Sequence, residues 1–165
     1  MNRIKKIVFA ALAAAALTGA AGAVHLDRPV QGSSSVSAGI RSSSAASEVV
    51  RLTNSARSQN GYAALVEDGA LSEAAAVRAR EIARSFSHTR PSGGSFSSAL
   101  SESGVSYLRA GENIASGQKS ASEVVNAWMN SPGHRANILN SSYSRIGSAS
   151  VNIDGTLYWV QLFAD

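Results

Sequence analysis

Two histidines and two glutamates are the residues of this chain whose types and spacing predict chemistry: His88, Glu112, Glu123 and His134. Imidazole and carboxylate groups are the side chains with which proteins most often bind metal ions or transfer protons. Glu112 is the most informative of the four. It lies in the small, mostly apolar segment 111–115, where a carboxylate must be hydrogen-bonded, paired with a charge or functional.

A helix break between Glu123 and His134 gives these two side chains a way to approach each other. On one straight helix they would lie about 16 Å apart along the axis, too far for a shared site. Ser131 and Pro132 predict a new helix, because serine is a common N-cap and proline a common first residue. The dipole of that helix would lower the pKa of His134. Residue types alone leave open that His134 only packs against the turn and that Glu123 is a solvated charge.

The elements that must position these residues are helices followed by a β-hairpin. Helical spacing of apolar residues predicts helices over 47–59 and 71–86, with Arg78 and Glu81 among the residues on the remaining face of the second. Shorter helices are expected at 95–102 and 122–129. A β-hairpin with both faces buried is predicted over 147–163. Apolar and polar residues alternate over 147–153, Asp154 and Gly155 form a turn, and the strand over 156–163 is apolar on both faces. This order indicates an α+β fold, a three-layer sandwich.

Three regions of the chain are predicted. Residues 1–23 have the basic start, the short apolar stretch and the small-residue cleavage site of a secretory signal peptide. Residues 24–46 are rich in serine and are expected to form a flexible linker, and residues 47–165 form the folded domain. We therefore expect a secreted protein that is not anchored in a membrane, since the apolar stretch is too short to cross one.

Charge and cysteine content narrow the class of protein further. Three of the 15 basic residues lie in 1–23 and all 11 acidic residues lie outside it, which leaves a charge of +1 on the rest. No run of lysines or arginines indicates a nucleic-acid partner. The chain has no cysteine, so its fold must depend on a hydrophobic core rather than on disulfides.

Several segments, read in order, resemble a known family: FSH at 86–88, GENIA at 111–115 and WMNSPGHRANIL at 128–139, followed by YWVQLF at 158–163. The pattern is similar to that of the bacterial branch of the CAP superfamily, which includes the cysteine-rich secretory, antigen 5 and pathogenesis-related class 1 proteins. The resemblance covers about 47–165 and implies the CAP fold, a three-layer α-β-α sandwich with a central antiparallel sheet and a cleft lined by two histidines and two glutamates.

The resemblance also implies roles for individual residues. His88 and His134 match the pair that holds a divalent ion such as zinc, Glu112 and Glu123 match the cleft carboxylates that would act in catalysis, and Asn113 and Asn137 match supports of the cleft wall. Functions that depend on the disulfides or on the cysteine-rich extension of other members are not implied here.

Three functions are compatible with these residues. The first is an extracellular binding module for a lipid or another cell-envelope ligand, with or without a metal ion, and it agrees with the lack of a nucleophile motif. The second is a metal-assisted, peptidase-like hydrolase that uses the same cleft, although two histidines are fewer than the three protein ligands usual for catalytic zinc. The third is a purely structural polar network, with function residing in surface contacts.

Overall fold

The computed structural model describes residues 34–165, and it describes side chains from Ala45 onwards. The predicted signal peptide and the first part of the predicted linker lie outside the described residues. The described helices and strands follow the order α1 (Ser34–Gln59), β1 (Val66–Glu67), α2 (Gly69–Arg84), α3 (Ser97–Glu102), β2 (Ala110–Ser116), α4 (Ala121–Met129), α5 (Pro132–Ile138), β3 (Arg145–Ile153) and β4 (Thr156–Ala164).

The strands form one sheet in the order β1-β3-β4-β2. β4 pairs antiparallel with both β3 and β2, as predicted for the hairpin, and the turn residues Asp154 and Gly155 both have positive φ, 51° and 79°. The two-residue strand β1 pairs parallel with β3, so the sheet is mixed rather than purely antiparallel. β2, which carries Glu112, lies at one edge of the sheet.

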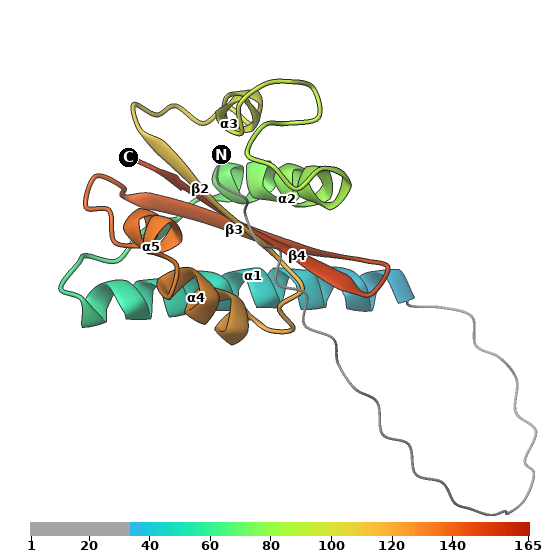
Figure 1. Ribbon diagram of the computed structural model, residues 1–165, viewed down its shortest axis with the longest axis horizontal. Coiled ribbons are helices and arrows are strands. Elements are labelled where there is room, and N and C mark those ends of the chain that lie inside the picture. Colours follow the sequence, from blue (N-terminus) through green and yellow to red (C-terminus); the bar gives the residue numbers. More distant parts are fainter. Residues whose placement is uncertain (1–33) are drawn as a thin grey trace, which may run out of the picture. The chain divides into compact units, whose positions relative to one another are not determined.

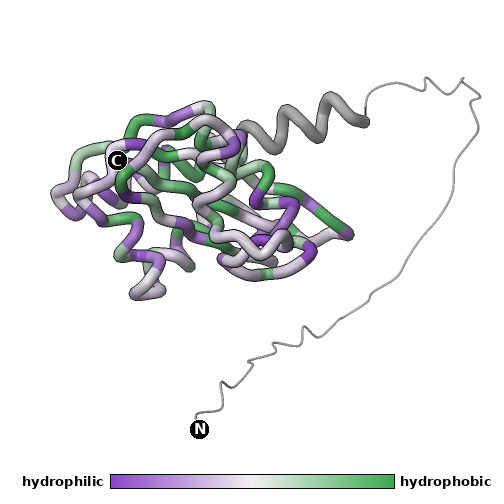
Figure 2. The backbone as a smooth tube through the Cα atoms, turned by 90° about the horizontal axis from the view of Figure 1, so that it is seen from above, coloured by the Kyte–Doolittle hydropathy of each residue, from purple (hydrophilic) through white to green (hydrophobic). Residues whose placement is uncertain are grey.

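Helices cover both faces of this sheet, which confirms the predicted three-layer sandwich (Figure 1). Side chains alternate along each strand and therefore feed two separate cores. One core, with Trp128, Trp159 and Phe163, packs against α1, α4 and α5; the other, with Leu71 and Leu162, packs against α2 and α3. Figure 2 shows the hydrophobic segments gathered in the interior of the folded part.

Two of the helix boundaries that differ from the predicted ones affect the packing. α1 begins at Ser34 instead of Ser47, because the intervening segment has no proline to stop a helix. Among the residues whose side chains are described, packing against the core begins at Ala45, which is partly buried. α2 ends at Arg84, so Phe86 lies beyond it and is 54% exposed instead of buried. The end of α1 is as predicted, with Gly61 in the left-handed region just beyond it.

Gly147 allows α2 to lie directly on the sheet. A Cβ atom at this position would lie 2.2 Å from the carbonyl carbon of Leu71 and 2.3 Å from the backbone nitrogen of Ser72. Both atoms belong to the backbone of the first turns of α2, so they cannot move aside as a flexible side chain can. Any larger residue at 147 must push the helix away from β3.

We expect Gly147→Ala to lower the free energy of unfolding by about 3 kcal/mol, since overpacking against backbone atoms separates a helix from its sheet. Urea denaturation of the purified protein measures this loss. Gly69→Ala is the matched control, because a Cβ there has no atom within 4 Å and the backbone φ is not positive. Equal stability of the two variants would contradict the close packing described here.

Candidate functional site

The edge strand β2 carries the center of the site. Neighboring residues of a strand point to opposite faces, so Glu112 points toward the α2 layer and Asn113 toward the α5 layer. Their contacts agree, because Glu112 bonds to Arg78 of α2 and Asn113 bonds to the backbone of α5. Both layers therefore contribute residues to this edge of the sheet.

Glu112 is held by a buried arginine. Its Oε1 accepts a hydrogen bond from Nε of Arg78 at 2.7 Å, and its Oε2 accepts one from Nη2 at 3.3 Å. Both side chains are 0% exposed. The sequence indicates that a carboxylate at this position must be hydrogen-bonded, paired with a charge or functional, and the structure shows that Glu112 is both hydrogen-bonded and paired with a charge.

His88 completes this arrangement from the loop after α2. Its Nδ1 lies 2.7 Å from Oε2 of Glu112, while its side chain is 57% exposed. An ionized carboxylate only accepts hydrogen bonds, so we assign the proton of the neutral ring to Nδ1. Nε2 then carries the lone pair, and it has no partner among the described residues.

A chain of ion pairs fixes the loop that bears His88. Arg78 also donates to Oε2 of Glu81 at 2.7 Å and to the carbonyl of Ser87 at 2.7 Å, and Glu81 pairs with Arg90 at 2.8 Å. Hydrogen bonds from Arg90 to Glu81, with a further contribution from Glu102, raise the pKa of Arg90 above its ordinary value. The segment on both sides of His88 is thus attached to α2.

His134 approaches from α5, which begins as predicted with Ser131 as the N-cap and Pro132 as the first residue. Its Nδ1 lies 2.9 Å from Oγ of Ser131, and the ring is half-buried. Burial lowers the pKa of His134, and the charge of nearby His88 lowers it further. The predicted direction is confirmed, and burial is its largest cause. Nε2 of His134 is also without a partner in the described part of the chain.

Glu123 does not join the other three residues. It is exposed near the start of α4, where its Oε2 accepts a hydrogen bond from the backbone nitrogen of Lys119 at 2.6 Å. Its own backbone nitrogen donates to Oγ of the N-cap Ser120 at 3.2 Å. Within residues 45–165 no hydrogen bond or ion pair links it to His134. The structure therefore gives Glu123 the role of a helix cap, and His88, Glu112 and His134 form what we call the edge site.

Asn113 and Asn137 attach α5 to the edge strand. Nδ2 of Asn137 donates to the backbone oxygen of Glu112 at 3.2 Å and to Oδ1 of Asn113 at 2.9 Å. Nδ2 of Asn113 in turn donates to the backbone oxygen of His134 at 3.1 Å and to the buried Gln161 at 3.2 Å. These contacts hold α5 against β2.

The edge site offers two nitrogen donors to a metal ion. Among the described residues no three His, Cys, Asp or Glu side chains are grouped so that they could hold one. Nε2 of His88 and Nε2 of His134 have no other partner within residues 45–165, whereas both oxygens of Glu112 are engaged by Arg78 and His88. Catalytic zinc usually has three protein ligands, so this donor set falls short of a catalytic zinc site.

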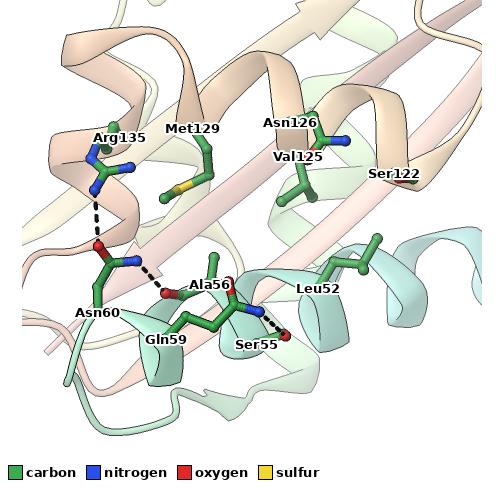
Figure 3. Close-up of a pocket in the computed structure, with 10 residues that line it drawn as sticks. All are labelled: Leu52, Ser55, Ala56, Gln59, Asn60, Ser122, Val125, Asn126, Met129 and Arg135. Atoms are coloured by element: carbon green, nitrogen blue, oxygen red, sulfur yellow. Dashed lines mark hydrogen bonds between the residues drawn. The ribbon is translucent and has the colours of Figure 1, made fainter.

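A groove lies between α1 and α4, on the face of the sheet opposite α2. Its volume is about 280 Å³. Apolar and polar side chains both line it, and Figure 3 shows them as Leu52, Ser55, Ala56, Gln59, Asn60, Ser122, Val125, Asn126, Met129 and Arg135. We call it the α1–α4 groove. It contains neither His88 nor Glu112, and nothing in the sequence patterns considered above predicts it.

The lowered pKa of His134 gives a testable pH dependence. The folded protein binds a proton at His134 less readily than the unfolded chain, so this residue's contribution to stability is complete above pH 6.5 and decreases as the pH falls through its folded pKa. In an NMR titration, the imidazole should titrate below the usual value of about 6.5. His88→Gln should raise the pKa of His134 only in part, since burial remains. Titration of His134 at or above its usual value in the unmodified protein would contradict this geometry.

Comparison with known proteins places this chain in a family. The sequence profile described as the Cysteine-rich secretory protein family (CAP) matches residues 50–163. The chain is 43% identical over 118 residues to the uncharacterized protein YkwD of Bacillus subtilis, a match that spans 70% of this chain and 45% of that protein. It is 34% identical over 113 residues to the uncharacterized membrane protein YlbC of the same species, spanning 67% and 32%. The chain thus spans less than half the length of these relatives.

Solved structures show the same fold. An extracellular protein of Bacillus anthracis that contains an SCP domain superposes with a TM-score of 0.68 at 27% identity, over 74% of this chain and 41% of that one. An outer surface protein of Borrelia burgdorferi superposes with a TM-score of 0.66 at 26% identity, over 71% and 89%. None of the helices in the described part of the chain is both long and apolar enough to span a membrane. By sequence profile and by fold, this cysteine-free chain belongs to the cysteine-rich secretory protein (CAP) family.

Proposed function

We propose that this protein is a secreted binding domain that takes up a lipid or another amphipathic ligand of the cell envelope in the α1–α4 groove. The observation that carries the proposal is the lining of the groove. Leu52, Ala56, Val125 and Met129 provide apolar surface, and the other lining residues are polar or charged. Four of the ten lining residues are thus apolar and six are polar or charged, and a concave site that combines both kinds of group suits a small amphipathic molecule.

Secretion is part of this proposal. Residues 1–23 have the pattern of a signal peptide. The Bacillus anthracis relative is described as an extracellular protein, and the Borrelia burgdorferi relative as an outer surface protein. A domain exported in this way meets lipids and wall components before it meets other macromolecules.

The edge site supports binding better than it supports hydrolysis. A general base must be free to accept a proton from water, but both oxygens of Glu112 are engaged by Arg78 and His88. Glu123 is a helix cap, and no hydrogen bond or ion pair joins it to either histidine among the described residues. The geometry therefore does not favor a peptidase-like hydrolase.

A divalent ion at the edge site would be held by His88 and His134, with Glu112 orienting the ring of His88. When bound, such an ion supplies a positive charge and open coordination positions. Water or a ligand would have to fill these positions, since the chain provides two donors. We accordingly propose that any metal is held weakly and that uptake of an amphiphile does not depend on it.

Filling the groove tests the proposed function. Ala56 is partly buried on α1 and lines the groove, so Ala56→Phe should occupy the space and weaken binding of a single-chain lipid at least about tenfold. Displacement of a neutral fluorescent probe, N-phenylnaphthylamine, from the purified mature protein measures the affinity.

The matched control is Ala127→Phe, which adds the same side chain to an exposed position of α4 that does not line the groove. The control should bind like the unmodified protein, with and without a chelator. Equal binding by both variants, or failure of the unmodified protein to bind any lipid, would overturn the proposed function.

A further inference from the structure

We propose that Ser131 is a positioning residue of the edge site: its side-chain oxygen keeps a proton on Nδ1 of His134, so that Nε2 carries the lone pair. This inference concerns the edge site and does not depend on the ligand proposed for the α1–α4 groove. The observation behind it is that the side chain of Ser131 begins α5 without capping it. Oγ of Ser131 lies 2.9 Å from Nδ1 of His134, and no backbone nitrogen in the described part of the chain donates to this oxygen.

Ser120 shows what a serine ordinarily does at the start of a helix. It is the N-cap of α4, and its Oγ accepts a hydrogen bond at 3.2 Å from the backbone nitrogen of Glu123, three residues further along. Ser131 occupies the same position in α5, and His134 is likewise three residues further along. Here the oxygen bonds to the ring of His134 and not to the backbone nitrogen of that residue. The hydroxyl of Ser131 therefore serves a side chain instead of the helix.

Other contacts hold the backbone of His134. The carbonyl of Ser131 accepts a hydrogen bond from the backbone nitrogen of Arg135 at 2.8 Å, which closes the first turn of α5. Nδ2 of Asn113 donates to the carbonyl of His134 at 3.1 Å. Pro132, as the first residue of the helix, restricts φ at the point where the chain turns. Because none of these contacts uses Oγ of Ser131, that oxygen is left to orient the ring.

The position of Ser131 makes its oxygen the acceptor of this bond. An N-cap oxygen faces the first turn of its helix, where backbone N–H groups lack partners within the helix. A hydroxyl hydrogen turned to that side would meet these N–H groups, so it points away and the ring donates through Nδ1. Glu112 holds His88 in the same way, with its Oε2 at 2.7 Å from Nδ1 of that ring. Both Nε2 atoms thus keep their lone pairs, as a divalent ion requires of two imidazole ligands.

The test reads the tautomer of each ring from long-range proton–nitrogen NMR spectra of the purified mature protein, well above the usual imidazole pKa of about 6.5. We expect the protonated nitrogen to be Nδ1 in both His88 and His134. Ser131→Ala should move most of the proton of His134 to Nε2, the preferred site in a free imidazole, and leave His88 unchanged. Ser131→Thr keeps a hydroxyl and should restore Nδ1–H. In calorimetric titrations, Ser131→Ala should weaken zinc binding about tenfold, as loss of a contact behind a metal-bound histidine does.

Ser120→Ala is the matched control, because it removes a hydroxyl that does cap a helix. It should lower the melting temperature by about 3 °C and leave both tautomers unchanged. Ser131→Ala should lower the melting temperature less, since its hydroxyl does not cap α5. A proton mainly on Nε2 of His134 in the unmodified protein would overturn the inference. So would a Ser131→Ala variant that keeps the tautomer or the zinc affinity of the unmodified protein. None of these outcomes bears on binding in the groove.

Discussion

The buried ion pair between Arg78 and Glu112 is the interaction on which the edge site depends. Removing two charges from water costs several kcal/mol for each ion, and the pair is tolerable only because its hydrogen-bonding groups are satisfied. Glu112 receives both contacts from Arg78 and one from His88, while Arg78 also binds Glu81 and Ser87. One interaction therefore joins α2 to the edge strand, fixes the His88 loop and sets the tautomer of its ring.

The edge site and the α1–α4 groove lie in different parts of the sandwich. The edge site forms where the α2 and α5 layers meet around β2, and amide contacts of Asn113 and Asn137 keep His134 there. The α1–α4 groove belongs to the opposite layer from α2. Nevertheless α5 connects them, because His134 belongs to the edge site and the next residue, Arg135, belongs to the groove. A ligand in the groove would thus contact α5, the helix that carries His134.

Local patterns in the sequence predicted much of this structure. The hairpin at Asp154 and Gly155 and the new helix at Ser131 are confirmed, because turn and cap preferences act over a few residues. The pattern of apolar residues places Arg78 on the remaining, polar face of its helix, whereas in the structure Arg78 lies seven residues from Leu71 on the buried face. Its partner Glu112 lies 34 residues further along the chain, so the pairing of these two residues can be recognized only once the fold is known. The helix break between Glu123 and His134 suggests that their side chains meet, because spacing along the chain does not reveal that Glu123 caps the start of α4.

The most direct test of the central claim is a double-mutant cycle on Arg78 and Glu112, with the free energy of unfolding measured for Arg78→Met, Glu112→Gln and both together. The buried pair predicts a loss of about 3 kcal/mol for Arg78→Met, because this change leaves an uncompensated buried carboxylate. The double variant should lose less than the sum of the single losses, with a coupling of about 2 kcal/mol. Additive losses would contradict the claim that this pair organizes the site.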